Sequence, residues 1–339
     1  MTQRNSKILV TGATGMVGAH LLWHLLKKGA FVRATKRGKS SLAQVELVFN
    51  FYGDSLANYP DQFEWINADV LEHESIENAM IDIAIVYHCA AVVSLSKKTR
   101  RILDINIRGT QNVVYAAVKM KVKKICFVSS IAALGKVSEG ELIDENAQWD
   151  VNDPHAVYAE SKYLSEEVVW QAAKKGLDVV IVNPGVILGV ADNLNNSMKI
   201  FSTVKKWMPL YTNGVNGYVS VQDVCRAMIQ LTESSITSER FVLVSQNLSH
   251  KKILTMVARA FNKIPPFING TKYVLYPLAF IFEMISKLLK INPIIDKGMV
   301  KVVLGRSYYS SEKIKRAIGF EFTPIEKTVG EICDFLKKK

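Results

Sequence analysis

The sequence contains few cysteines, and none lies in a pattern typical of a metal site or a disulfide framework. Its 339 residues include four cysteines, and no two of them form a Cys-x-x-Cys pair. Two lie in apolar runs typical of buried strands, so we interpret the cysteines as reduced core residues. The sequence therefore predicts neither a disulfide-stabilised fold nor a metal site. The cysteines are Cys89, Cys126, Cys225 and Cys333.

Long apolar runs are also missing. The run over residues 273–282 is uncharged, but it is far shorter than the ~18 residues that a membrane span requires. No apolar stretch follows the first charged residues, so no signal peptide is expected, and we predict a soluble, cytoplasmic protein. The apolar segment 273–289 leaves three interpretations open. It forms core, a lid over an apolar substrate, or a helix that contacts a membrane surface.

Acidic residues are fewer than basic ones. The chain has 43 lysines and arginines against 31 aspartates and glutamates, a net charge of +12. This balance is compatible with nucleic acid, an anionic membrane surface or an acidic ligand. The basic run 97–101 either attracts an anionic substrate or is a solvated helix start. No aromatic residues interleave with it, so we expect a small-molecule substrate and no nucleic acid.

Short apolar runs alternate with helical patterns through the first half of the chain. Because the runs are apolar along their whole length, both faces of the sheet are expected to be covered. This predicts an α/β fold with a doubly wound parallel sheet. The predicted strands are 7–11, 31–35, 63–67, 83–88, 124–129 and 178–183, and the main predicted helices are 16–28, 99–119 and 154–175.

Three glycines lie where the first predicted strand meets the first helix. Gly12 permits a tight turn, Gly15 lets the backbone approach a pyrophosphate, and Gly18 allows close helix–strand packing. The helix N-terminus adds free N–H groups and a partial positive charge. The motif predicts a dinucleotide site, with a purely structural glycine turn as the alternative. The residues predicted to contact the cofactor here are Gly12, Ala13, Thr14, Gly15, Met16 and Val17.

The glycine turn and the weaker alternation after Pro184 together predict two domains. Residues 1–190 are expected to form a dinucleotide-binding Rossmann domain of about seven strands, to which a strand near 240–245 returns. Residues 191–339 are expected to form mainly a smaller, mostly helical domain that binds the substrate.

The end of the second predicted strand indicates which dinucleotide binds. An acidic residue there would bond the adenosine 2′-hydroxyl of NAD, but residues 32–39 contain no acid. Lys36 and Arg37 are placed to hold a 2′-phosphate instead. We therefore predict a preference for NADP(H), with NAD(H) as the other cofactor considered. The alternative is that both side chains are solvated loop cations.

Tyr158 and Lys162 lie four residues apart in a predicted helix, so their side chains share one face. A lysine ammonium at this spacing can lower the pKa of a tyrosine and reach a ribose hydroxyl. Only this pair begins a helix shortly after a strand that ends in hydroxyls, at the edge where ligands of doubly wound sheets bind. Two other pairs have the same spacing, namely Tyr115 with Lys119 and Tyr309 with Lys313.

Taken together, these motifs resemble the extended short-chain dehydrogenase/reductase family, also called the NAD-dependent epimerase/dehydratase family. Within it, the sequence is most similar to the dihydroflavonol 4-reductase and 3β-hydroxysteroid dehydrogenase-like branch. The similarity covers about residues 7–225 and includes Thr-Gly-Ala-Thr-Gly-Met-Val-Gly at 11–18. The other matching segments are 69–70, 88–91, 106–112, 129–135, 158–162, 183–189, 218–224 and the tail around 308–331.

The resemblance implies roles for individual residues. Ser130 would hydrogen-bond the substrate oxygen, with Ser129 as the weaker candidate. Tyr158 would transfer the proton, and Lys162 would hold the nicotinamide ribose. Asn106 matches a position that orients a helix and a water near that lysine. The further cofactor contacts implied are Asp69, Val70, Ala90, Ala91, Pro184 and Val186.

The sequence departs from the family pattern at two places. Asn183 stands where many relatives carry an arginine before the Pro-Gly pair, which changes the polarity expected near the nicotinamide. Lys36 and Arg37 stand where epimerase-like relatives often carry an aspartate. The second departure argues against an epimerase that retains NAD.

We therefore predict an oxidoreductase that interconverts a secondary alcohol and a ketone by hydride transfer. The first alternative is a nucleotide-sugar epimerase or dehydratase with retained NAD. The second is a dinucleotide-sensing protein without catalysis, although such proteins typically lose the tyrosine or the lysine. The resemblance also makes a homodimer through two long helices reasonable.

Overall fold

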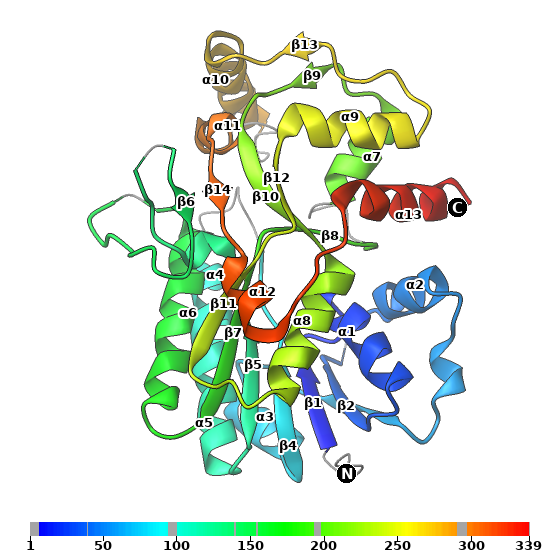
Figure 1. Ribbon diagram of the computed structural model, residues 1–339, viewed down its shortest axis with the longest axis vertical. Helices are drawn as coiled ribbons and strands as arrows, with labels where there is room; N and C mark the ends of the chain where they lie inside the picture. The colour runs from blue at the N-terminus through cyan, green and yellow to red at the C-terminus, as the bar shows by residue number, and fades with distance from the viewer. Residues whose placement is uncertain are drawn as a thin grey trace.

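The computed structural model describes residues 7–38, 40–93, 100–138, 140–153, 155–192, 198–289 and 297–338. Its centre is a seven-stranded sheet with the order β11-β7-β5-β4-β1-β2-β3, and every pairing in it is parallel. The predicted doubly wound parallel sheet is therefore confirmed (Figure 1). The strands are β1 (Lys7–Thr11), β2 (Val32–Lys36), β3 (Phe63–Asn67), β4 (Ile83–His88), β5 (Lys124–Val128), β7 (Asp178–Pro184) and β11 (Glu239–Leu243).

Helices cover both faces of this sheet, which explains why its strands are apolar along their length. Ile8 and Val10 of β1 pack into one core cluster, whereas Leu9 between them packs into the other. Alternate residues of the strand thus bury on opposite faces. One face is covered by α1 (Met16–Lys27), α2 (Ala43–Phe51) and α8 (Val221–Glu233), and the other by α3 (His73–Ala79), α5 (Gly109–Lys119) and α6 (Val157–Ala173).

The prediction of one continuous helix over 99–119 is wrong, because the structure has separate elements in this range. A short α4 (Arg100–Leu103) passes into a π-helical turn over Asp104–Arg108 before α5 begins. Such turns frequently occur at functional sites, and this one contains Asn106. The predicted helix over 154–175 begins later, because Ala156 is extended and α6 starts at Val157. Residues 97–99 of the basic run, Lys39 and Pro154 lie outside the described residues.

The chain leaves the large sheet after β7 and returns to it through α8 and β11. Within this excursion, β8 (Val186–Leu188) and β10 (Val215–Ser220) form a three-stranded sheet with β12 (Gln246–Ser249), which follows β11. Two strand pairs join β9 (Leu210–Tyr211) to β13 (Ile268–Asn269) and β6 (Leu142–Ile143) to β14 (Tyr308–Tyr309). The helices outside the two layers on the large sheet include α7 (Met198–Lys206), α9 (His250–Ala260), α10 (Lys272–Leu289), α11 (Lys297–Leu304), α12 (Glu312–Ile318) and α13 (Ile325–Lys337).

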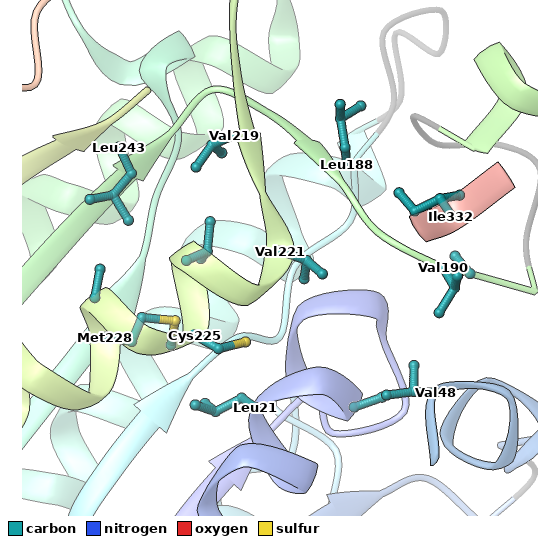
Figure 2. Packing of buried hydrophobic residues seen from close by; sticks show 14 of the residues in the cluster. Leu21, Val48, Leu188, Val190, Val219, Val221, Cys225, Met228, Leu243 and Ile332 are labelled. Carbon is teal, nitrogen blue, oxygen red and sulfur yellow. The ribbon is translucent and has the colours of Figure 1, made fainter. Parts of the chain in front are cut away.

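A single buried cluster joins the large sheet to the smaller part of the molecule. Figure 2 shows Leu21 of α1 and Cys225 of α8 in the same packed region as Leu188 of β8 and Val219 of β10. The cluster continues to Ile332 on α13. Because interiors are close-packed, this shared core holds the smaller part against the carboxyl edge of the sheet.

No helix in the described part of the chain is long and apolar enough to cross a membrane. The segment 273–289 forms α10, which buries only part of its surface. Leu275 and Ala279 pack with Val300 of α11, whereas most apolar side chains of α10 are exposed. The core-packing interpretation therefore accounts for only one side of this helix.

Candidate active site

The glycine turn connects β1 to α1 along a path that leaves no room for side chains. Gly12 has a φ of +68°, in the left-handed region, and a Cβ there would lie 2.7 Å from the backbone of Ala90. A Cβ on Gly18 would lie 2.2 Å from the carbonyl oxygen of Gly12. At Gly15 no side chain caps α1, and its first turn contains no acid. The N–H groups at this helix start are thus suited to a pyrophosphate.

The other residues expected to contact a cofactor follow neighbouring strands at the same edge of the sheet. The Asp69 carboxylate accepts the backbone N–H of Leu71 at 3.0 Å, which fixes the turn beyond β3. Ligands of doubly wound sheets bind beyond the carboxyl ends of the strands. Asp69 and Val70 follow β3, Ala90 and Ala91 follow β4, Pro184 ends β7, and Val186 begins β8.

The end of β2 touches the glycine turn. The hydroxyl of Thr35 accepts the N–H of Gly12 at 3.3 Å. Lys36 is the last residue of the strand, and its Nζ lies 5.8 Å from the centre of the Trp65 ring. Arg37 follows and is exposed. Two cations therefore lie at the position where a carboxylate would bind the 2′-hydroxyl of NAD.

Ser130 and Tyr158 lie within hydrogen-bonding reach of each other. Ser130 follows β5, and its hydroxyl accepts the N–H of Ala132 at 3.1 Å. Tyr158 lies in the first turn of α6. Burial raises the pKa of Tyr158, whereas its hydrogen bond with Ser130 lowers that pKa. The arrangement places a polarised phenol and a fixed hydroxyl side by side.

Lys162 lies one turn beyond Tyr158, buried at the end of β5. Its Nζ donates to the carbonyl oxygen of Val128 at 2.7 Å and lies 4.6 Å from the centre of the Phe127 ring. Burial lowers its pKa to about 8, and the carboxylate of Glu166 is the largest opposing influence.

The other two tyrosine–lysine pairs have different surroundings. Tyr115 is exposed, and Lys119 forms an ion pair with Glu77 at 2.8 Å. Lys313 pairs with Glu239, and its tyrosine lies on β14. Spacing alone did not distinguish the three pairs, but their positions in the fold do.

Asn106 connects the π-helical turn to the start of α6. Its Nδ2 donates to Ser161 Oγ at 2.9 Å and to the carbonyl oxygen of Val92 at 3.1 Å. Its Oδ1 accepts the N–H of Val92 at 2.8 Å. Ser161 in turn donates to the carbonyl oxygen of Tyr158 at 2.7 Å. Asn106 thus positions the helix that carries both Tyr158 and Lys162.

The same turn is linked to β1 through a buried histidine. Thr110 donates to the carbonyl oxygen of Asn106 at 2.6 Å, so its hydroxyl accepts from His88 Nε2 at 3.1 Å. The Nδ1 of His88 then accepts from Thr11 Oγ1 at 2.7 Å. Burial lowers the pKa of His88 to about 3, so the ring is neutral. It acts as a rigid connector between β1 and the π-helical turn.

Comparison with models of known protein families identifies the family of this chain. The model of the NAD dependent epimerase/dehydratase family matches residues 8–243. The chain belongs to that family. The match covers β1 to β11 and so includes the glycine turn, Ser130, Tyr158 and Lys162.

Relatives of this epimerase/dehydratase family member include proteins named as reductases. A putative dihydroflavonol 4-reductase of Synechocystis sp. is 29% identical over 329 residues, which cover 95% of this chain and 92% of that protein. Sterol demethylase protein B of Methylococcus capsulatus is 31% identical over 251 residues, 73% of this chain and 72% of that protein. The crystal structure of gox2253 superposes with a TM-score of 0.81 at 26% identity and covers 98% of each chain. The protein is therefore an NAD(P)-dependent enzyme of the extended short-chain type.

The sequence did not predict a buried charged network that surrounds Glu166, beside Lys162. Glu166 lies one turn beyond Lys162 and accepts from Asn183 Nδ2 at 2.5 Å. Its other oxygen pairs with Arg240 of β11 at 3.1 Å. Asn183 also donates to the carbonyl oxygen of Ser130 at 3.0 Å. The network thus joins the lysine, the serine and the edge strand of the sheet.

The only sequence signal for this network was the spacing of Glu166 four residues after Lys162. Its partner Arg240 lies 74 residues further along the chain, so no local pattern connects them. The guanidinium is fixed by two hydrogen bonds to the carbonyl oxygen of Glu145, at 2.6 and 3.0 Å. It therefore supplies a positive charge to the same carboxylate that Asn183 contacts.

A second overlooked residue is Trp149, in the loop that leads into Tyr158. Its ring stacks on Tyr163 of α6 with centroids 4.5 Å apart and on His155 with centroids 3.7 Å apart. The loop is further held by an ion pair between Lys136 and Asp153 at 2.6 Å. Stacking on the residue next to Lys162 orients the loop over the start of α6.

Proposed function

We propose that the protein interconverts a secondary alcohol and a ketone with an exchangeable nicotinamide cofactor. The observation that carries the proposal is the joint placement of Ser130, Tyr158 and Lys162 beyond the carboxyl end of β5, across the sheet edge from the glycine turn. The cofactor supplies the hydride when it is bound. The reductase names of the relatives support the same reaction class.

In reduction, Tyr158 gives its hydroxyl proton to the substrate oxygen, and in oxidation it accepts that proton. Ser130 holds the same oxygen, because its hydroxyl already lies within hydrogen-bonding reach of Tyr158. The Ala132 N–H fixes the orientation of this serine. The substrate is thereby placed with its oxygen between two hydroxyls.

Lys162 holds a ribose hydroxyl of the cofactor and provides a positive charge near the proton-transfer site. Nζ donates one hydrogen bond to the carbonyl oxygen of Val128, and a lysine ammonium has further protons that would bind such a hydroxyl. A pKa of about 8 keeps most of the lysine charged at neutral pH. The role predicts a loss of turnover as the pH rises through that value.

We further propose that NADP(H) is the preferred dinucleotide. Lys36 and Arg37 lie beside the glycine turn, and no carboxylate follows β2 within residues 32–39. A 2′-phosphate carries charge that both cations can neutralise. Lys36→Ala/Arg37→Ala is expected to weaken NADPH binding by about tenfold or more and to leave NADH binding unchanged. Equal losses for both cofactors would refute this preference.

The first experiment identifies the nucleotide in freshly purified protein and measures its exchange with NADPH and NADH. An exchangeable site that prefers NADPH supports a reductase, and ketones can then be screened by loss of NADPH absorbance. A nucleotide-sugar epimerase or dehydratase is the second candidate, because the family model that matches residues 8–243 includes such enzymes. Stoichiometric NAD that survives purification, with no net cofactor consumption during turnover, would favour that candidate.

We also propose that the enzyme forms a homodimer through α5 and α6. Tyr115 and Val118 on α5 and Leu164 on α6 expose apolar surface on these two helices. Helix pairs of this kind can form a four-helix interface about a twofold axis. Light scattering after size-exclusion chromatography should give the mass of two chains, and a single-chain mass would refute the proposal.

A further inference from the structure

Helix α10 is apolar on the side that faces away from the protein. Leu275, Ala279 and Ser286 are buried, and the first two pack against Val300 of α11. These positions form one stripe along the helix. A surface helix ordinarily presents charged residues on its other side, but most of the described residues on the other side of α10 are apolar.

The outer stripe of α10 consists of large apolar side chains at helical spacing. Tyr273 is 79% exposed, Phe280 is 53% exposed and Met284 is 58% exposed. Tyr276 and Ile281 lie between them and are also exposed. At about 3.6 residues per turn, these five positions share one broad face of the helix.

Neighbouring segments extend this apolar surface. β13 pairs with β9, and Phe267 and Ile268 both donate their N–H groups to the carbonyl oxygen of Pro209. Trp207 is 71% exposed just before this strand pair, and Ile264 is 80% exposed just before Phe267. We call the outer stripe of α10 together with Trp207, Ile264, Phe267 and Ile268 the tip surface. In Figure 1, α10, β9 and β13 lie together at the end of the molecule opposite the N-terminus.

The segments of the chain that carry the tip surface are strongly basic in sequence. Segments 198–220 and 246–309 contain thirteen lysines and arginines but only two acidic residues, which amounts to +11 of the net charge of +12. Lys206, Lys263 and Lys272 are exposed beside the tip surface. None of these three forms an ion pair with any acidic residue that the structure describes.

We propose that the tip surface docks onto an anionic lipid bilayer. A contiguous exposed apolar surface of this kind marks an interaction site. Tryptophan and tyrosine favour the headgroup level of a membrane, and lysines beside them are attracted to anionic lipids. A second copy of the chain is a poorer occupant, because two surfaces of the same positive charge would repel each other.

The test is flotation of the purified full-length protein with vesicles. One set contains phosphatidylglycerol in phosphatidylcholine, and the other contains phosphatidylcholine alone. We expect binding to the anionic vesicles that is at least about tenfold stronger than to the neutral ones and that weakens with added salt. A protein that stays at the bottom of the gradient with both vesicle types would overturn the proposal.

Matched variants show whether the tip surface is responsible for binding to anionic vesicles. Tyr273→Ser/Met284→Ser and Lys263→Glu/Lys272→Glu should each reduce flotation by about tenfold or more. Ile81→Ser/Val151→Ser removes exposed apolar residues elsewhere, and Lys174→Glu/Lys175→Glu reverses exposed charges at the end of α6. Neither control should change flotation. Equal losses in test and control variants would refute the assignment.

Two further measurements distinguish membrane docking from misfolding and from self-association. Circular dichroism melting should show that the variants remain folded. The mass of the protein particle in solution would increase with concentration if the tip surface bound a second copy, and Tyr273→Ser/Met284→Ser would lower it. That result, without any vesicle binding, would overturn membrane docking. Turnover of a water-soluble ketone should be the same in all four variants, so failure of docking and failure of the proposed reaction are distinguishable.

Discussion

The carboxyl edge of the large sheet and the tip surface use polar and charged residues in opposite ways. At the sheet edge, His88, Asn106, Lys162 and Glu166 are almost completely buried, and each has a specific partner. At the tip, the cations are exposed and the apolar side chains face outward. The buried cluster beneath α10 is separate from the core that joins the large sheet to β8 and β10 (Figure 2).

The two regions should respond differently to substitution because their polar groups differ in burial. A buried hydrogen-bonded group costs much free energy when it loses its partner, because water cannot replace that partner. An exposed charge or apolar side chain contributes only a small part of the total free energy of binding at a surface. Single conservative changes should therefore have large effects at the sheet edge and small ones at the tip.

The largest expected effect is acid destabilisation from two buried histidines. Burial lowers the pKa of His20 and of His88 to about 3. Below pH 6.5 the unfolded chain takes up protons that the folded protein does not, so stability falls with pH. Each histidine should remove about 2 kcal/mol of unfolding free energy between pH 7 and pH 5.

Urea unfolding at pH 7 and pH 5 measures this loss. His20→Gln removes one of the two groups and should roughly halve the pH dependence that they contribute. His73→Gln replaces a half-exposed histidine and serves as the control. A stability that does not change between pH 7 and pH 5 would contradict the buried, neutral state of these rings.

The next effect concerns proton transfer. Tyr158→Phe removes the hydroxyl but keeps the ring, so turnover should fall by at least ~10²-fold while cofactor binding stays the same. Turnover is followed by NADPH absorbance, and cofactor affinity by fluorescence titration. Tyr115→Phe carries the same change in the exposed pair on α5 and should have no effect. Unchanged turnover in Tyr158→Phe would remove this tyrosine from the mechanism.

A smaller effect is expected one turn further along α6. Glu166→Gln keeps the side-chain shape but removes the negative charge that raises the pKa of Lys162. The pKa of the lysine should fall below about 8, so the alkaline decline of kcat should move to lower pH. At neutral pH we expect a loss of about threefold to tenfold.

The control for this change is Glu167→Gln, because Glu167 is the next residue and is exposed. Its pH profile should match that of the unsubstituted enzyme. If Glu166→Gln lowered stability but left the pH profile of kcat unchanged, Glu166 would have only a structural role.

A similarly small effect is expected at the tip surface. Lys263→Ala removes one exposed cation, and partitioning onto anionic vesicles should weaken by about fivefold, the usual increment for one charge. The effect should vanish at high salt, because exposed charges are screened. Lys174→Ala is the matched control. A loss as large as that of Tyr158→Phe would refute the contrast between the two regions.

Much of the large sheet was predictable because its signals are local. Strands β3 and β4 coincide with the predicted ranges, since short apolar runs bounded by turns identify buried strands. The glycine turn was equally clear from its position between a strand and a helix. Lys162 was identified by its spacing from Tyr158 and by the strand that precedes the helix.

Other features depend on residues that are distant in sequence. The π-helical turn interrupts the helix predicted over 99–119, and Asn106 within it is bonded to Ser161, 55 residues away. The strands β6, β9, β13 and β14 have two residues each, too few for a periodicity to emerge. The exposure of Tyr273 could not be predicted either, because an apolar run has the same composition whether it faces the core or the solvent.

The sequence by itself predicted the strands of the large sheet, the glycine turn and the shared helix face of Tyr158 and Lys162, because these follow from short-range periodicity and spacing. The role of Ser130 was implied by the family resemblance. Only the tertiary structure decided which face of α10 is covered and that Arg240 closes the charged network around Glu166. Both depend on contacts between distant segments, and burial and charge pairing are properties of the packed chain rather than of any local stretch of it.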